Sequence, residues 1–222
     1  MDRKKLCLIF TGDFLLAITV RVILCLPFIF FVRETEYELF VAALATQAGF
    51  LAVCFYRLYR FKRIEFSLPS FFEGPTKEAI RLGVITGLVL FVLNITHGMI
   101  LQSLSGIDLA EKNPWAQMEE FSFFSRLLTF IAGGLFAPVV EEFFLRGIMF
   151  GAFVAAGHTR TGVIFTTILF VGLHLDPTNS FAYAMLGLGF LWVYYRTRNL
   201  LAPIIAHGIN NVVGFIFILI PF

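Results

Sequence analysis

Long apolar stretches dominate the chain, and short polar or basic segments separate them. A helix needs about 20 mostly apolar residues to cross the hydrocarbon core of a bilayer. By this measure the sequence predicts about seven spans, within a range of six to eight, at residues 7–32, 38–56, 80–101, 121–153, 161–175, 181–195 and 200–220. No stretch alternates as the strands of a membrane barrel do. The predicted fold is therefore an all-α, polytopic transmembrane helical bundle.

The composition agrees with this pattern. Hydrophobic residues make up 59% of the 222 residues and charged residues only 14%, whereas soluble domains are about 25% charged. The mean hydropathy is +0.86. A chain of this composition has too little polar surface to cover itself in water, so we expect the lipid bilayer as its surroundings. No nucleic-acid partner is expected.

Basic residues gather in the loops on one alternating side of the predicted spans. Twelve of the 17 Lys and Arg residues fall on that side, whereas acidic residues predominate on the other. Because cytoplasmic loops carry the excess of Lys and Arg, we expect the N-terminus to be cytoplasmic. An eighth span or a re-entrant segment would move the C-terminus to the other side. The twelve residues are Arg3, Lys4, Lys5, Arg57, Arg60, Lys62, Arg63, Lys77, Arg81, Arg160, Arg196 and Arg198.

The polar residues divide the chain into two parts. Residues 1–120 contain N-terminal helices and polar loops, and residues 121–222 contain nearly all the intramembrane polar residues that suggest chemistry. The first span holds Asp13 and Arg21 and has no small-residue cleavage site, so we interpret it as a membrane helix rather than a signal peptide. Asp13 and Arg21 are read as a buried pair or as residues near the span ends, without an assigned role.

The fourth predicted span carries two adjacent carboxylates. Pro138 removes a backbone donor there, which predicts a kink or a local opening. Glu142 and Arg146 are spaced i, i+4 and can pair on one helix face. Glu141 points about 100° away and is left without a local partner. A carboxylate in such a low-dielectric setting takes up a proton readily, which suits a general base or acid.

Two later spans repeat the i, i+4 spacing. Phe170 lies one turn before His174, and His207 lies one turn before Asn211. The imidazole and amide of the second pair are hydrogen-bond donors that could converge on a developing oxyanion. Ionisable residues inside a membrane are costly and usually functional. Each of these residues alone also has a plain structural interpretation, because a single His often packs in a helix and Asn often bridges helices.

These motifs together resemble the CPBP family, which comprises CAAX prenyl endopeptidases of the Rce type and their prokaryotic Abi relatives. The resemblance covers about residues 121–215. It implies that Glu141 activates the attacking water with His174, and that His207 and Asn211 stabilise the oxyanion. The matching motifs are Glu141-Glu142-Phe-Phe-Leu-Arg146, Phe170-Val-Gly-Leu-His174 and His207-Gly-Ile-Asn-Asn211.

The resemblance also implies supporting roles and a substrate class. Glu142 and Arg146 would shape the site, and Phe170 would pack beside His174. The expected activity is intramembrane hydrolysis of a peptide bond in a membrane-presented peptide or lipidated protein, either a prenylated CAAX protein or a bacteriocin- or signal-type peptide. The expected location is a prokaryotic inner membrane, because the chain is short and lacks features that would mark it as eukaryotic.

Several alternatives stay open from the sequence. No cofactor is expected, because a carboxylate base of the glutamate type needs only residues already present. Zinc is the alternative, since Glu141, His174 and His207 could form a His₂Glu site with one open position. The competing functions are a proton-coupled transporter, because Glu and His also serve proton pathways, and a non-catalytic immunity or scaffold protein that kept the fold.

Overall fold

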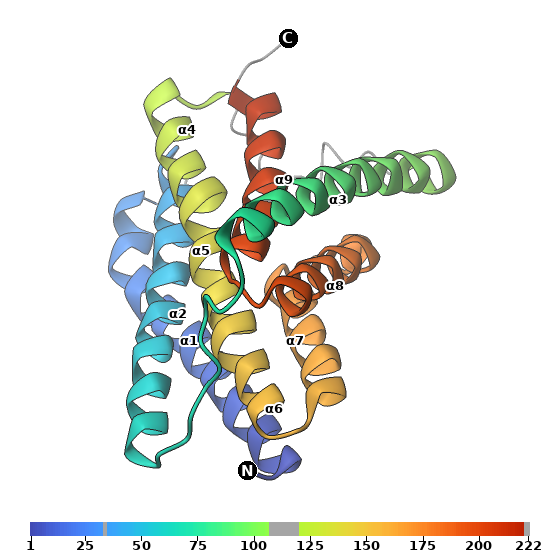
Figure 1. The fold of residues 1–222 in the computed structure, drawn as a ribbon. Helices are drawn as coiled ribbons and strands as arrows, with labels where there is room; N and C mark the ends of the chain where they lie inside the picture. The colour runs from blue at the N-terminus through green and yellow to red at the C-terminus, as the bar shows by residue number, and fades with distance from the viewer. Residues whose placement is uncertain (33–34, 107–119, 220–222) are drawn as a thin grey trace.

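The computed structural model describes residues 1–32, 35–106 and 120–219 as seven helical rods (Figure 1). Within these residues there is no strand, only an isolated β-bridge between Phe72 and Asn199, so the predicted all-α fold is confirmed. The rods are α1 (Arg3–Val32), α2 (Glu38–Arg63), α3 (Thr76–Ser105), the composite rod α4–α6 (Phe123–Ala155), α7 (Thr159–Leu173), α8 (Ser180–Thr197) and α9 (Leu201–Leu219). A short 3₁₀ turn, η4 (Pro177–Asn179), precedes α8.

Four of these helices are long and apolar enough to cross a membrane, namely Arg3–Leu26, Glu38–Arg63, Thr76–Ser105 and Phe123–Ala155. Thr159–Leu173 and Leu201–Phe215 are shorter apolar helices. The protein is therefore an integral membrane protein, and the count of seven spans stays a prediction. Large apolar side chains that are more than half exposed suit contact with lipid; among them are Leu8, Val92, Met99 and Ile168.

The composite fourth rod runs without a break through Pro138. It consists of α4 (Phe123–Thr129), the π-helical segment η2 (Phe130–Phe136), α5 (Ala137–Glu142), a second π-helical segment η3 (Phe143–Phe150) and α6 (Gly151–Ala155). The predicted local opening at Pro138 thus takes the form of a widened π-helical turn just before it. Pro138 stands in the first turn of α5, where a missing N–H is tolerated. Such π-helical turns often mark functional sites.

An ion pair joins the two N-terminal helices. The Arg57 Nε on α2 donates to the Asp13 carboxylate on α1 at 2.7 Å, and the Arg57 Nη2 also pairs with it. Asp13 is buried, and the Arg57 guanidinium lies over the rings of Phe10 and Phe61. The buried partner of Asp13 is therefore Arg57 on the neighbouring helix rather than Arg21 on its own.

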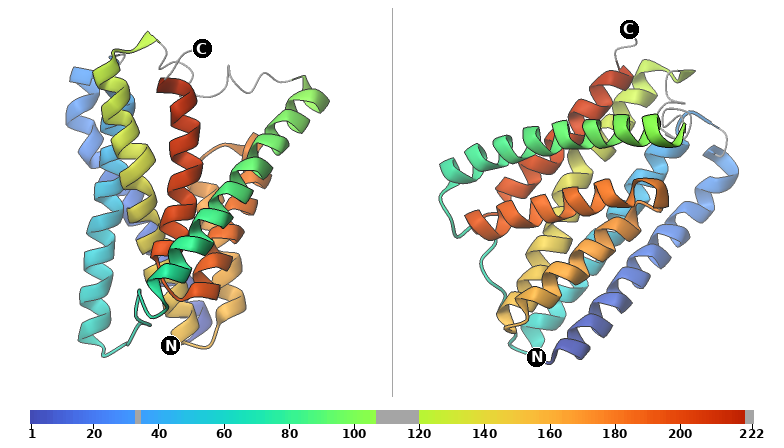
Figure 2. Two further views of the ribbon diagram at one scale, coloured as in Figure 1. Left: turned by 45° about the horizontal axis from the view of Figure 1, so that its top comes forward. Right: turned by 90° about the vertical axis from the view of Figure 1, so that its right-hand side faces the viewer.

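Small residues let α3 cross closely over α9 (Figure 2). A Cβ atom at Gly83 would lie 2.7 Å from the Ala202 carbonyl oxygen, and one at Gly87 would lie 3.0 Å from the Ala206 Cα. The backbones touch at both points. Close approach at small residues is a common way for membrane helices to pack. This crossing holds the part of α9 that carries His207.

The segment between α2 and α3 is clipped to the turn between α8 and α9. The Leu200 N–H donates to the Phe71 carbonyl at 2.8 Å, and the Asn199 side-chain amide donates to the Gly74 carbonyl at 2.9 Å. Arg198 takes a left-handed conformation, with φ 52°, to make this turn. Phe50 of α2 also packs against Phe144 of η3, with ring centres 5.0 Å apart. The N-terminal and C-terminal parts therefore share one core, and the predicted division near residue 120 stays a prediction.

Candidate active site

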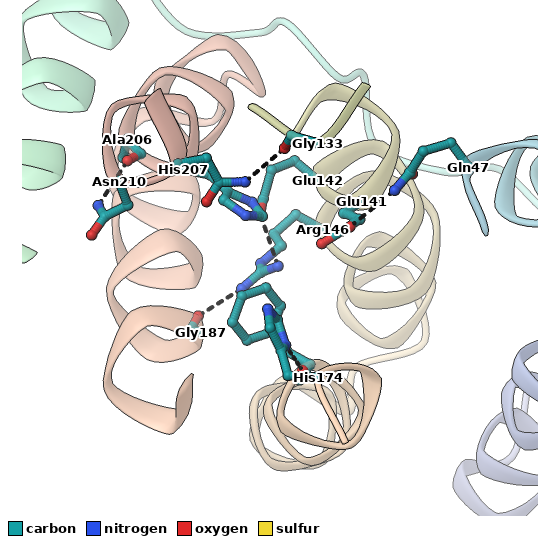
Figure 3. Close-up of polar contacts among 12 residues, drawn as sticks. Gln47, Gly133, Glu141, Glu142, Arg146, His174, Gly187, Ala206, His207 and Asn210 are labelled. Carbon is teal, nitrogen blue, oxygen red and sulfur yellow. Dashed lines mark hydrogen bonds and ion pairs between the residues drawn. The ribbon is translucent and has the colours of Figure 1, made fainter. Parts of the chain in front are cut away.

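A buried carboxylate lies at the centre of the site (Figure 3). The Glu142 Oε1 accepts a hydrogen bond from the Arg146 Nη1 at 3.0 Å and lies 2.9 Å from the His207 Nδ1. Glu142, Arg146 and His207 are only 0%, 1% and 4% exposed. Glu142 ends α5, Arg146 lies one turn later on η3, and His207 comes from α9. The i, i+4 spacing predicted from the sequence thus forms an ion pair that also reaches a third helix.

Arg146 is held on several sides. Its Nη2 donates to the Gly187 carbonyl of α8 at 2.8 Å, and its guanidinium carbon lies 5.0 Å from the centre of the Phe170 ring and 5.7 Å from that of Phe190. Two aromatic faces and two hydrogen bonds compensate for the burial of a charged group that water would otherwise solvate. Arg146 therefore joins the composite rod to α7 and α8.

Glu141 is directed away from this network. Its Oε1 accepts a hydrogen bond from the Gln47 Nε2 of α2 at 3.2 Å (Figure 3). The side chain is half-buried, and the residues described in the structure give it no ion-pair partner within 4.0 Å. The structure thus separates the two adjacent carboxylates: Glu142 is paired with Arg146 and His207 in the core, and the described partner of Glu141 is a neutral amide.

His174 caps the C-terminal end of α7. Its Nδ1 donates to the Phe170 carbonyl at 2.8 Å, so the neutral ring carries its proton there and leaves Nε2 as an acceptor. The ring stacks on Tyr183 at 3.9 Å and lies 4.8 Å from Phe170. No direct hydrogen bond joins His174 to Glu141 in the described part of the chain.

The two asparagines of α9 have different surroundings. The Asn211 Nδ2 donates to the Gly133 carbonyl of η2 at 3.0 Å. Asn210 donates to the carbonyls of Gly87 and Ala206 and so fixes the α3–α9 crossing. Asn210 therefore has a packing role. One of the two N–H bonds of the Asn211 amide is engaged with Gly133, and the other can still serve a ligand.

Comparison with known proteins finds a family that the site-bearing part of the chain resembles. Residues 123–213 match the family described as type II CAAX prenyl endopeptidase Rce1-like. The expected resemblance is confirmed, and we call residues 123–213 the Rce1-like segment. All seven residues of the predicted site lie within it.

A curated relative supports the same class. The protein named "Putative membrane peptidase YdiL" from Bacillus subtilis (strain 168) is 25% identical over 139 residues. This match covers 61% of the present chain and 56% of the relative, so the chain spans little more than half of that protein's length. No solved structure matches the chain.

A metal centre is the alternative that the sequence leaves open for this segment. In the parts of the chain that the structure describes, no three His, Cys, Asp or Glu side chains are placed to hold a metal ion. Both histidines are engaged through Nδ1, His174 with a backbone carbonyl and His207 with Glu142, an orientation that metal-ligating histidines also adopt. The zinc alternative considered from the sequence therefore stays open. Water activation without a metal stays a prediction.

Four contributors to the site were not predicted from the sequence. Tyr183 and Phe190 stack on the two histidines, the Gly187 carbonyl receives Arg146, and Gln47 bonds Glu141. Gln47 was the most recognisable from the sequence, because an amide in the middle of an apolar helix needs a partner. The other three are aromatic or backbone contacts, for which the sequence carries no distinguishing signal.

Proposed function

We propose that this protein is an intramembrane endopeptidase in which Glu141 is the general base. The observation that carries the proposal is the separation of the two neighbouring carboxylates. Glu142 is engaged in a buried network with Arg146 and His207, whereas the partner that the described residues give Glu141 is a neutral amide. A carboxylate without a counter-ion is suited to taking a proton from water. The family match and the peptidase relative support the same chemistry.

The proposed reaction is hydrolysis of an amide. A water oxygen bonds to the carbonyl carbon while one of its protons passes to Glu141, and the carbonyl π electrons move to oxygen. When this intermediate collapses, the C–N bond breaks and the proton passes to the leaving nitrogen, directly or through the free His174 Nε2. The products are a carboxylic acid and an amine. No step needs an oxidant or a bound cofactor.

His207 and Asn211 would stabilise the oxyanion, with His207 in its protonated form. The His207 Nδ1–H is directed at Glu142, so only an imidazolium has a second N–H, at Nε2, to offer the substrate. The Glu142 carboxylate supports that positive charge at 2.9 Å. The free N–H of the Asn211 amide is the second donor. Preorganised donors of this kind account for a large share of catalysis in acyl transfer.

The substrate class follows from the setting of the site. Because the candidate residues lie on membrane helices, the substrate would be presented from the bilayer or its surface. We propose a lipidated protein tail or a small membrane-associated peptide, cleaved in a prokaryotic inner membrane by a protein whose N-terminus is cytoplasmic. The basic residues of the N-terminal side support this orientation.

Turnover by purified protein tests the proposal. We would measure cleavage of quenched fluorescent peptides in liposomes, both a farnesylated CAAX peptide and its unlipidated form, using wild type, Glu141→Ala and His174→Ala. Glu78→Ala and His158→Ala are the matched controls, since they remove the same groups in an exposed pair with Arg196 and in the turn before α7. We expect turnover in wild type and both controls, and loss in both site variants.

Repeating the turnover assay with a metal chelator tests how the water is activated. Turnover that persists in chelator supports Glu141 as the base, and turnover that chelator abolishes and zinc restores would replace it with a metal mechanism. If Glu141→Ala cleaves as well as wild type, the assignment of Glu141 falls. If wild type cleaves neither these peptides nor small peptides released from native membranes, the endopeptidase proposal itself falls.

A further inference from the structure

Gln47 reaches the site from outside the Rce1-like segment. It lies in the middle of α2, is only 3% exposed, and its Nε2 donates to the Glu141 Oε1 across 94 positions of the chain. Packing on two sides holds this part of α2 in place. A Cβ atom at Gly49 would lie 2.6 Å from the Ala17 carbonyl oxygen of α1, and the Phe50 ring packs against that of Phe144 of η3. The amide is therefore presented to Glu141 by a closely packed helix.

The other end of the same amide lacks a partner. The Gln47 Oε1 is buried and accepts no hydrogen bond from any residue that the structure describes. A buried carbonyl oxygen without a donor is costly. A water molecule beside Glu141 would supply that donor, because water has two O–H bonds and Glu141 needs only one of them. The pair of side chains thus presents two acceptors to one small donor.

We propose that Gln47 is a further residue of the hydrolytic site, which orients Glu141 through Nε2 and holds the attacking water through Oε1. This inference rests on the proposed function. The water would donate one O–H to Glu141 and the other to Gln47, which leaves a lone pair for the carbonyl carbon. Only Glu141 takes a proton; Gln47 exchanges none. The N-terminal helices would then supply part of the reaction centre, in addition to anchoring the protein in lipid.

Gln47→Met tests the role directly, because Met has a similar length and lacks both the donor and the acceptor. We expect kcat to fall about tenfold to hundredfold, the loss expected for one hydrogen bond to a charged group, with KM within about twofold. The acidic limb of the kcat–pH profile should move to higher pH, since the ionised carboxylate loses its donor. Thr46→Val is the matched control, because the hydrogen bond that the described residues give the Thr46 hydroxyl is to the Ala42 carbonyl of its own helix.

Gln47→Glu distinguishes the role of the Gln47 Oε1 acceptor from that of the Nε2 donor. It keeps an acceptor oxygen but places a second carboxylate against Glu141, and two close carboxylates resist being ionised together. The acidic limb should therefore move further than in Gln47→Met. A purely structural Gln47 would instead lower the yield of folded protein and leave the pH profile unchanged. If the kcat–pH profiles of Gln47→Met and Gln47→Glu both match that of Thr46→Val, the proposal is overturned.

A measurement without substrate decides the Gln47–Glu141 coupling independently of turnover. Carbodiimides modify protonated carboxyl groups, and mass spectrometry locates the label on Glu141. In Gln47→Met, labelling should persist to higher pH than in wild type and Thr46→Val. Identical labelling curves would overturn the role of Gln47 even if Glu141 proves essential. Absence of peptidase activity would instead count against the proposed function, and the labelling curves would still decide whether Gln47 controls the proton on Glu141.

Discussion

Glu142 and His207 are 65 positions apart in the chain and are joined by a contact of 2.9 Å between a carboxylate oxygen and a ring nitrogen. The same Oε1 atom accepts the Arg146 guanidinium. One oxygen therefore fixes the rotation of the composite rod relative to α9, and Arg146 extends the connection to α8 through the Gly187 carbonyl. The position of the candidate catalytic groups depends on this buried network.

Removing the charge of Glu142 should destabilise the fold. In Glu142→Gln, Arg146 stays buried at 1% exposure without its counter-ion. Breaking a buried pair in this way costs about 3–5 kcal/mol. We expect a clear fall in the thermal unfolding temperature in detergent, measured by scanning fluorimetry. The wild-type protein and Glu78→Gln, which alters an exposed pair, provide the reference.

The double variant Glu142→Gln/Arg146→Met separates charge from packing. Replacing a whole buried pair is often close to neutral, so the double variant should unfold at a higher temperature than Glu142→Gln alone. If the double variant is at least as unstable as the sum of the two single changes, the buried charge is not the cause of the loss. The stability that the network provides would then come from the packing of its side chains and not from their charges.

Asn211 should be needed for catalysis more than for stability. Its one described hydrogen bond is to the Gly133 carbonyl, so Asn211→Ala should lower the free energy of unfolding by only about 1 kcal/mol. As an oxyanion donor it should be worth a factor of about 10²–10³ in kcat, with little change in KM. Asn210→Ala, which breaks bonds to Gly87 and Ala206, is the control. A kcat loss no larger than that of Asn210→Ala would limit Asn211 to bridging helices.

Local spacing predicted the parts of this structure that depend on one helix. The apolar stretches predicted the seven helical rods of the described residues, and the i, i+4 rule predicted the Glu142–Arg146 pair, because both depend only on helix geometry. Pro138 indicated a disturbance, but the widened turn that relieves it, η2, depends on the surrounding packing. Local rules therefore predict which residues matter and leave open the form of the backbone around them.

The same local rules could not predict the contacts between helices. Asp13 could be recognised as a residue that needs a partner, yet Arg57 lies 44 positions away and the nearer Arg21 was an equally plausible candidate. Gln47 and Glu141 are 94 positions apart. The sequence likewise placed His207 with the oxyanion donors and missed its bond to Glu142. Which helix faces become neighbours is decided by the packing of the whole bundle.

The Asp13–Arg57 pair should hold α1 against α2. In Asp13→Asn the Arg57 guanidinium loses its counter-ion but keeps the rings of Phe10, Tyr56 and Phe61, so we expect a loss of about 1–3 kcal/mol. Asp2→Asn at the exposed N-terminus is the matched control. Thermal unfolding in detergent measures the effect. A change in Asp13→Asn no larger than in Asp2→Asn would mean that the ion pair contributes nothing measurable.

Gly87→Ala should separate α3 from α9 and disturb the site from a distance. The added Cβ would lie 3.0 Å from the Ala206 Cα and from the Ile209 Cβ, and the backbone atom cannot rotate away as a flexible side chain would. Overpacking of this kind costs about 1–3 kcal/mol, against a gain of about 1 kcal/mol from replacing a helical Gly by Ala. Because Ala206 directly precedes His207, displacement of α9 should also lower kcat.

Gly12→Ala provides the matched comparison, since nothing lies within 4 Å of the Cβ that it adds on α1. That variant should unfold at or above the wild-type temperature and keep full turnover. The difference between the two variants isolates the steric cost of the α3–α9 contact, because the helix-propensity gain is common to both. Equal unfolding temperatures and equal kcat values in the two variants would show that α3 and α9 do not need this close approach to hold His207 in place.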